Sequence, residues 1–350
     1  MMNRTEIATW LREADPARLN ELWRKADRLR QEHVGGEVHL RGLIEISSHC
    51  VRMCAYCGLR AANRDIQRYR MTEDEILACA RQAVTFGYGT VVLQSGEDPG
   101  LRAPWIAELI RRIKADTPLA VTLSLGERDD DELALWREAG ADRYLLRFET
   151  SNPTLYAKIH PSLPGKPSDR MAILRTLRRL GYEVGSGAMI GIPGQTHDDL
   201  AADIEQFAAL DLDMIGVGPY LPHPDTPLGQ ACEETVDDQV AGDELTTYKV
   251  IALTRLGCPR ANIPSTTALA TLNKAQGREF GLVRGANVVM PNLTPAKYRA
   301  LYEIYPSKAC ITETAEACHG CMRGRIASLG RAVGVGRGDS ANYGLRGSYS

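Results

Sequence analysis

Residues 90–124, TVVLQSGEDPGLRAPWIAELIRRIKADTPLAVTLS, contain one βα unit and the strand that follows it. The ends of this stretch, residues 90–94 and 120–124, are short runs of apolar and β-branched side chains, which are typical of buried strands. Residues 103–114 between them repeat apolar side chains at the spacing of an amphipathic helix. The order strand, helix, strand predicts two parallel strands joined by a crossover helix.

The same alternation extends over most of the chain, and one helix start carries a capping-box pattern, Thr72 with Glu75. Eight strands are expected, at residues 43–46, 90–94, 120–124, 144–147, 185–190, 214–217, 261–265 and 287–290. Eight parallel βα units predict an α/β fold, a complete (β/α)8 TIM barrel. An open doubly wound sheet is the alternative, but no GxGxxG turn follows the first strand.

The chain of 350 residues is 44% hydrophobic and 25% charged, as in an ordinary globular protein. We expect one barrel domain, residues 37–306, preceded by an N-terminal helical cover, residues 1–36, over the bottom of the barrel. Residues 307–350 are expected to form a short C-terminal extension, irregular in its last part, which is rich in Gly and Ser.

The net charge of −2 gives no sign of a nucleic-acid-binding surface. No run of 18 apolar residues indicates a membrane span, and the N-terminus lacks the apolar core of a signal peptide. We therefore expect a cytoplasmic protein whose partners include neither nucleic acid nor membrane.

The nine cysteines indicate metal or redox chemistry, because disulfides are rare in the cytoplasm. A CxxxCxxC group, Cys50, Cys54 and Cys57, follows the first expected strand and therefore lies at the C-terminal mouth of the barrel, where barrel active sites are found. Three thiolates are one short of a closed zinc site or a fully ligated cubane. The spacing predicts a 4Fe–4S cluster with one open iron, and zinc completed by His49 is the alternative. No role is expected for three scattered cysteines: Cys79, Cys232 and Cys258.

With Tyr56 as the aromatic residue before the third cysteine, the group resembles the motif of radical S-adenosylmethionine (SAM) enzymes. The resemblance implies an oxygen-sensitive enzyme in which the open iron binds the amino and carboxylate groups of SAM. One electron from the reduced cluster then cleaves the sulfonium and yields a 5′-deoxyadenosyl radical. No catalytic residue is expected beyond the cluster and the SAM site.

Polar groups at other strand ends are expected to bind SAM. The turn Ser95-Gly96-Glu97 resembles the family's motif for the methionine amino group, and an ordinary loop is the alternative. Arg147 and Glu149 alternate along the fourth strand and suit the SAM carboxylate and the ribose or ammonium. A mutual structural ion pair is the alternative for these two.

Two further residues complete the expected SAM site, in addition to Tyr56. Arg170, at the start of the next helix, is a weaker candidate for the SAM carboxylate. Ile192 lies in MIGIPGQT, residues 189–196, which resembles the region of the family that contacts adenine.

Several longer stretches narrow the resemblance, among them CAYCGLR, VVLQSGEDPG, LLRFETSNPTLY and GPYLPHPDTPL. They are similar to the HydE-type maturases of iron–iron hydrogenase. This resemblance implies action on an iron–carbonyl–cyanide–cysteine precursor of the di-iron centre (H-cluster), partner maturases, and an electron donor such as ferredoxin or flavodoxin.

Other assignments stay open. A methylornithine synthase-like mutase or another HydE paralogue is the alternative, and a non-enzymatic iron–sulfur carrier is the alternative of another class. Biotin synthase shares the cysteine motif but differs at the fourth strand. Phe148 stands where the maturases are expected to carry histidine.

The substrate is expected to contact residues after the last two strands. Neutral hydrogen-bond donors there suit a small anionic ligand, and helix capping by Ser265 or Thr266 is the alternative. The expected substrate residues are Ser265, Thr266, Thr267, Met290, Tyr298 and Tyr302.

A second cysteine group lies near the C-terminus: Cys310, Cys318 and Cys321. In the family that the chain resembles, such a group can hold a second iron–sulfur cluster, 2Fe–2S or 4Fe–4S. Zinc with His319 is the alternative. We expect an optional cluster whose loss spares SAM cleavage.

Overall fold

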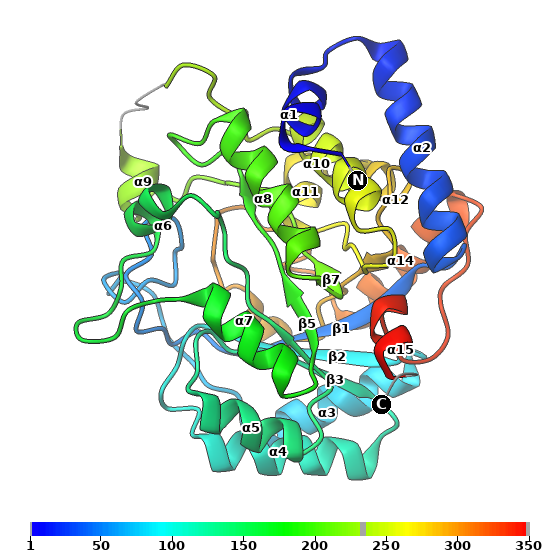
Figure 1. Ribbon diagram of the computed structural model, residues 1–350. Coiled ribbons are helices and arrows are strands. Elements are labelled where there is room, and N and C mark those ends of the chain that lie inside the picture. Colours follow the sequence, from blue (N-terminus) through cyan, green and yellow to red (C-terminus); the bar gives the residue numbers. More distant parts are fainter. Residues whose placement is uncertain (1, 232–235, 348–350) are drawn as a thin grey trace.

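The computed structural model describes residues 2–231 and 236–347, so Cys232 lies outside the described residues. Seven parallel strands form one sheet in the order β7-β5-β4-β3-β2-β1-β9 (Figure 1). Neighbours from β1 to β5 follow the chain order, as expected for successive βα units. The strands are β1 (His39–Ser47), β2 (Thr90–Ser95), β3 (Ala120–Ser124), β4 (Arg143–Leu145), β5 (Glu183–Ser186), β7 (Met214–Ile215) and β9 (Val288–Val289).

The sheet curves into a half-barrel, because the strand direction turns strongly between β1 and β7 (Figure 1). The expected strand 185–190 is split into β5 and β6 (Met189–Ile190), and β6 pairs with β8 (Gly218–Pro219) in a second small sheet. The split falls at Gly187, where an added Cβ would lie 1.8 Å from the carbonyl oxygen of Gly216. Only glycine therefore fits at the point where the strand divides.

The expected seventh strand, residues 261–265, is not a named strand of the structure. It makes isolated parallel bridges instead, from Asn262 to Met214 and from Pro264 to Val288. Pro264 has no N–H to donate to a ladder, which explains why pairing is limited to single bridges. The described strands thus form the parallel α/β sheet that was expected, without a complete ring of eight strands.

Helices cover the outer face of the sheet (Figure 1). The capping box predicted at the start of α3 is confirmed. Thr72 N–H donates to Glu75 Oε2 at 2.9 Å, and Glu75 N–H donates to Thr72 Oγ1 at 3.4 Å. The helices of the barrel region are α3 (Glu73–Thr85), α4 (Ala103–Asp116), α5 (Asp130–Glu138), α6 (Pro153–Ile159), α7 (Arg170–Arg179), α8 (His197–Ala209), α9 (Pro227–Gln230), α10 (Glu244–Gly257), α11 (Thr267–Leu272), α12 (Gly277–Leu282) and α13 (Ala296–Arg299).

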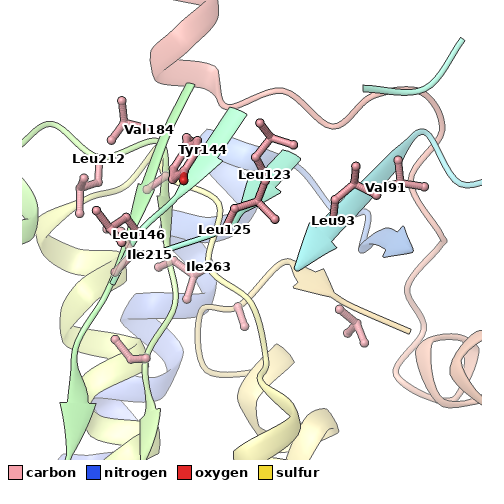
Figure 2. Close-up of a cluster of buried hydrophobic side chains, with 14 of the residues drawn as sticks. Val91, Leu93, Leu123, Leu125, Tyr144, Leu146, Val184, Leu212, Ile215 and Ile263 are labelled. Carbon is pink, nitrogen blue, oxygen red and sulfur yellow. The ribbon is translucent and has the colours of Figure 1, made fainter. Parts of the chain in front are cut away.

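Strand side chains alternate between the outer core and the barrel interior. Figure 2 shows Val91 and Leu93 of β2 beside Leu123 of β3 in a buried apolar cluster. Side chains at the alternate positions point to the other face of the sheet, and two of them, Glu45 of β1 and Gln94 of β2, line a cavity inside the barrel. Burial of each Leu or Val contributes about 1.5–3 kcal/mol, so the outer face stabilises the sheet and leaves the inner face available for polar groups.

The two N-terminal helices were expected at the bottom of the barrel, and the structure places them differently. Helix α1 (Arg4–Arg12) packs against α8 and α10, and α2 (Pro16–Val34) packs against α10, so both lie outside the helical layer (Figure 1). The residues that they bury include Ile7 and Leu11 of α1 and Leu22 and Ala26 of α2.

The C-terminal segment instead contacts the N-terminal ends of the strands. Thr90 Oγ1 donates to Arg337 O at 2.7 Å, and Arg143 forms an ion pair with Asp339. Helix α15 (Ala341–Gly347) follows, where irregular chain was expected, and α14 (Ala315–Ser328) precedes it. Within the described ranges, no helix is long and apolar enough to cross a membrane.

Candidate functional site

The loop after β1 brings three thiols together at the barrel mouth. Cys54 is buried, and Cys50 and Cys57 are half-buried. Burial, with a smaller contribution from the charge of a Cys50 thiolate, raises the pKa of Cys54 to about 12. Burial likewise raises the pKa of Cys57, as do charges on the other two thiols. The three thiols thus influence one another within a single loop, where iron coordination would remove the cost of holding them as thiolates.

The turn after β2 packs directly on this loop. Val51 N–H donates to Glu97 O at 2.9 Å. A Cβ on Gly96 would lie 2.3 Å from His49 O and 2.7 Å from the Cβ of Cys50, so only glycine allows this approach. Gly96 therefore packs this turn tightly against the cysteine loop.

Among the described residues, no three His, Cys, Asp or Glu side chains surround a point that would hold a single metal ion. An iron–sulfur cluster is larger than a single ion. Two features of the site fit such a cluster: three thiols on one loop, and buried polar atoms at the mouth that have no hydrogen-bond partner. Two such atoms are Arg147 Nε and Tyr220 Oη. Unpaired buried polar atoms are costly, and their presence at the mouth fits a polar ligand next to the thiols.

Arg147 and Glu149 form the ion pair that sequence reasoning left open. Arg147 Nη2 lies 3.0 Å from Glu149 Oε2, while Tyr56 Oη donates to Glu149 Oε1 over 3.4 Å. Glu149 has φ +65, a left-handed conformation that costs about 1–3 kcal/mol in a residue other than glycine. The surrounding structure must therefore stabilise this conformation, and Glu149 N–H donates to Gly187 O at 3.1 Å.

Glu97 is already engaged within the protein. Its Oε1 accepts from Arg52 Nε at 2.7 Å, and its Oε2 accepts from the backbone N–H of Glu127 at 2.8 Å. Arg52 also contacts Glu127 Oε2 at 2.8 Å, and all three side chains are buried. A contact between Glu97 and the SAM ammonium would therefore share oxygens that already accept hydrogen bonds. Ser95 Oγ donates to the Gly96 carbonyl at 2.6 Å.

Arg170 links this network to the ion pair. Its Nε donates to Glu127 Oε1 at 3.0 Å, and its Nη1 donates to Arg147 O at 2.5 Å and lies 4.0 Å from Glu149 Oε1. The charges of Glu127 and Glu149 contribute to raising the pKa of Arg170 against the opposing effect of burial. The guanidinium is thus held charged between the two carboxylates.

Apolar residues form the other side of the site. Ile192 is buried with Ala55 and Tyr220, and Tyr56 packs against this group. Phe148 points elsewhere, because its ring lies 5.5 Å from Phe207 within the main core. Phe148 therefore does not cover the Arg147–Glu149 pair.

A cavity of about 160 Å³ inside the barrel adjoins Arg147. Met290 lines it, as do the three hydroxyl residues after the bridge segment: Ser265, Thr266 and Thr267. Thr266 also caps α11, as the capping alternative predicted, whereas Ser265 Oγ donates to Arg278 O at 3.1 Å.

The two expected tyrosines lie in different places. Tyr302 accepts a hydrogen bond from Gln94 Nε2, at 3.3 Å, beside the cavity wall. Tyr298 stacks on Tyr69 with a centroid distance of 4.4 Å and donates to Glu75, outside the residues that line the cavity.

A second buried ion pair, Lys308 with Glu45, lines the same cavity. Asn292 Nδ2 donates to the other oxygen of Glu45 at 3.0 Å. Sequence reasoning missed this pair, although a glutamate inside the apolar run of β1 was a signal. It also missed Arg52, Glu127 and His160, which come from separate loops and share no local pattern.

The C-terminal thiols adjoin a separate pocket of about 360 Å³, lined by Cys310 and Cys321 and by several cations. A hydrogen bond from Cys318 lowers the pKa of Cys310, with a further contribution from Arg278. Arg325 Nε donates to Cys321 Sγ at 3.4 Å. His319 is engaged elsewhere, because its ring stacks on Phe86 and its Nδ1 lies 3.0 Å from Tyr88 Oη.

Residues 44–207 match the radical SAM superfamily. The FeFe-hydrogenase maturase subunit HydE of Thermotoga maritima is 48% identical over 89% of this chain and 86% of its own length. The 3-methylornithine synthase of Methanosarcina barkeri is 30% identical over 79% of this chain and 75% of its own length.

Two solved structures share the fold. A methylornithine synthase superposes with a TM-score of 0.78 at 24% identity and covers 95% of this chain and 94% of its own. The FeFe-hydrogenase maturase HydG gives a TM-score of 0.78 at 18% identity and covers 99% of this chain and 74% of its own. The matching radical SAM region and the identity to HydE show that the chain belongs to the HydE-type enzymes of the radical SAM superfamily.

Proposed function

We propose that this chain is a hydrogenase maturase that uses SAM radical chemistry to help assemble the di-iron centre of iron–iron hydrogenase. Its proposed substrate is an iron–carbonyl–cyanide–cysteine precursor. The observation that carries the proposal is the 48% identity to HydE over 89% of the chain, together with three converging thiols at the barrel mouth. Partner maturases and an electron donor such as ferredoxin or flavodoxin belong to the same proposal.

The proposed cofactor site holds a 4Fe–4S cluster on Cys50, Cys54 and Cys57, with one iron open to SAM. When bound and reduced, the cluster supplies the electron that cleaves SAM to a 5′-deoxyadenosyl radical. The convergence of buried thiols supports this assignment, because the protein provides three thiols on one loop and the cluster needs one free position.

The ion pair at the mouth is the proposed anchor for SAM. Arg147 would bind the SAM carboxylate through its fork, and Glu149 would bind the ribose or the ammonium. Support comes from Arg147 Nε, which is buried and has no hydrogen-bond partner, and from the buried Glu149 carboxylate that pairs with Arg147 Nη2. The charges of Arg147 and Glu149 already face each other. A zwitterionic ligand could place its carboxylate on Arg147 and its ammonium on Glu149, so that both charges would stay paired when their mutual contact is broken.

Other residues are proposed to orient SAM and keep water away. Arg170 would hold Glu149 and the Arg147 backbone in place, supported by its contacts with both. The remaining proposed contacts with SAM are Tyr56, Ser95, Gly96, Glu97 and Ile192.

The barrel cavity is the proposed substrate site. Support comes from its position beside Arg147 and from its hydroxyl lining, which can donate to an anionic ligand without binding it too tightly. Of the proposed substrate residues, Ser265, Thr266, Thr267 and Met290 line the cavity and Tyr302 lies beside its wall. Tyr298, which donates to Glu75 outside the cavity lining, is the remaining proposed substrate residue.

The proposed organisation is a complete barrel in residues 37–306, with residues 261–265 as the strand that closes the ring. The bridges of Asn262 and Pro264 to their two neighbours support this closure. Residues 1–36 would be a helical cover and residues 307–350 an extension. An optional second iron–sulfur cluster is proposed on Cys310, Cys318 and Cys321, supported by the cationic pocket at these thiols. We also propose a cytoplasmic location, with no nucleic-acid or membrane partner.

The decisive experiment has two stages. Protein reconstituted anaerobically with iron and sulfide is incubated with SAM and dithionite, and 5′-deoxyadenosine is quantified, with Cys54→Ser as the matched control. The wild type should form 5′-deoxyadenosine and the control should not. The gene is then expressed in a host whose own HydE has been deleted, where recovery of hydrogenase activity supports the maturase.

Methylornithine synthase is the second candidate, favoured by the 30% identity over 79% of the chain. Lysine is therefore added to the SAM assay. Lysine-dependent formation of methylornithine, without recovery of hydrogenase activity in the deletion host, would replace the maturase proposal by the mutase.

A further inference from the structure

His160 lies against a cysteine of the proposed cluster. It is the C-cap residue of α6, and its side chain is 1% exposed. Its Nδ1 lies 3.0 Å from Cys54 Sγ. The backbone holds the two residues together, because Ala55 N–H donates to Ile159 O at 2.8 Å. The contact is therefore built into the packing of α6 on the cysteine loop.

The other ring nitrogen meets a guanidinium and a carboxylate. His160 Nε2 lies 3.0 Å from Arg170 Nη2 and 3.1 Å from Glu127 Oε1. Arg170 Nε also donates to Glu127 Oε1 at 3.0 Å, so its fork spans the imidazole and the carboxylate. Ser168 Oγ and Arg52 Nη2 donate to Glu127 as well, at 2.6 and 2.8 Å.

These contacts decide which ring nitrogen carries hydrogen when Cys54 is a thiolate. With the N–H on Nδ1, a neutral ring donates to the thiolate and Nε2 accepts from Arg170 Nη2, which can only donate. With the N–H on Nε2, the ring would donate to Glu127 Oε1 and would place its Nδ1 lone pair against the thiolate, so a Cys54 thiolate favours the first tautomer. In an imidazolium both nitrogens carry hydrogen, with Nε2–H facing Glu127. In the first tautomer and in the imidazolium, an N–H of His160 therefore points at Cys54 Sγ.

We propose that His160 is a positioning residue for the cluster, whose Nδ1–H donates to the Cys54 sulfur and raises the reduction potential of the cluster. The inference rests on the proposed cluster at Cys50, Cys54 and Cys57. A hydrogen bond to a ligating sulfur favours the reduced cluster, because that state carries one more negative charge. It also holds Cys54 in one rotamer at the side of the site where Arg170 meets Arg147 and Glu149.

The test compares three substitutions with the wild-type full chain. His160→Phe keeps an aromatic ring without a donor. His160→Asn places an amide N–H near the position of Nδ1, whereas His160→Gln places it near Nε2. This amide pair is a matched control, because it separates a donor that faces Cys54 from one that faces Glu127 and Arg170.

The readouts are iron content and the midpoint potential of the cluster, followed by electron paramagnetic resonance during an anaerobic redox titration. The titration is repeated in C310S/C318S/C321S, so that the signal comes from the front thiols alone. We expect His160→Phe and His160→Gln to lower the ratio of reduced to oxidised cluster about tenfold at a fixed potential, which is about 59 mV for one electron. We expect His160→Asn to stay near the wild type.

An unchanged midpoint in iron-loaded His160→Phe would overturn the proposal, as would equal shifts in the Asn and Gln variants. If the Phe and Gln variants lose iron while the Asn variant keeps it, the proposal is supported through the position of Cys54. Equal loss of iron in all three variants would overturn it. A wild-type protein that binds no cluster at the front thiols would instead refute the proposed function, so the two failures are distinguishable.

Discussion

The ion pair between Lys308 and Glu45 joins the C-terminal extension to the first strand, and Lys308→Met tests what it contributes. The two side chains are only 4% and 1% exposed. Methionine keeps the apolar stem of lysine and removes its charge, so Glu45 would be buried without its cation. Breaking a buried pair in this way costs about 3–5 kcal/mol.

Two features of the structure set the expected magnitude. Glu45 retains the hydrogen bond from Asn292 Nδ2, which argues for the lower end, about 3 kcal/mol. Glu45→Gln leaves Lys308 with its contact to Tyr302 O at 3.2 Å and should also destabilise the protein. The double variant leaves no unpaired charge, so it should lose less than the sum of the single variants by about 1–3 kcal/mol.

The free energy of unfolding is measured by urea titration with circular dichroism, on samples of equal iron content. Lys297→Met is the matched control, because its ammonium pairs with Glu75 while its side chain is 63% exposed, and no comparable loss is expected. The reasoning would be refuted by additive single and double variants, or by a Lys308→Met variant as stable as the control. Limited proteolysis near residue 308 should be faster in Lys308→Met than in the wild type and should be unchanged in the Lys297→Met control.

Three further predictions concern SAM, pH and the C-terminal thiols. Arg147→Gln should weaken SAM binding about 10- to 100-fold in calorimetry at unchanged iron content, because it removes a charge-assisted contact, and an unchanged Kd would contradict this. Burial raises the pKa of Asp203 from 3.8 to about 7, so its contribution to stability is fully present below about pH 4 and is lost as pH rises through 7. Asp203→Asn should therefore flatten the decline of about 1.4 kcal/mol per pH unit between those values in urea titrations, and an unaltered pH profile would count against the assignment. The C310S/C318S/C321S variant should lose iron yet still form 5′-deoxyadenosine, and failure to cleave SAM would show that the second site is required.

The first strands and the cysteine loop could be predicted because their signals are local. The apolar runs of β2 and β3 (Thr90–Ser95 and Ala120–Ser124) lie between good helices, and their periodicity alone indicates parallel βα units. The CxxxCxxC spacing after β1 then indicates the barrel mouth, since strand direction fixes which end of the barrel a following loop occupies.

Other features depend on contacts between distant parts of the chain. The segment 261–265 has strand-like composition, but Pro264 leaves it only single bridges to its neighbours. Helices α1 and α2 show apolar faces without revealing which surface covers them, and the structure sets them on α8 and α10.

The polar network of the site is the clearest case of this division. Sequence alone indicated that cysteines, Arg147 and Glu149 gather at one end of a barrel, because each follows a strand. Only the tertiary structure decided that His160 meets Cys54 and that Lys308 reaches Glu45, 263 residues away in the chain. Such pairs leave no periodic trace in the sequence, because a buried charge is stabilised by whichever partner the fold brings to it.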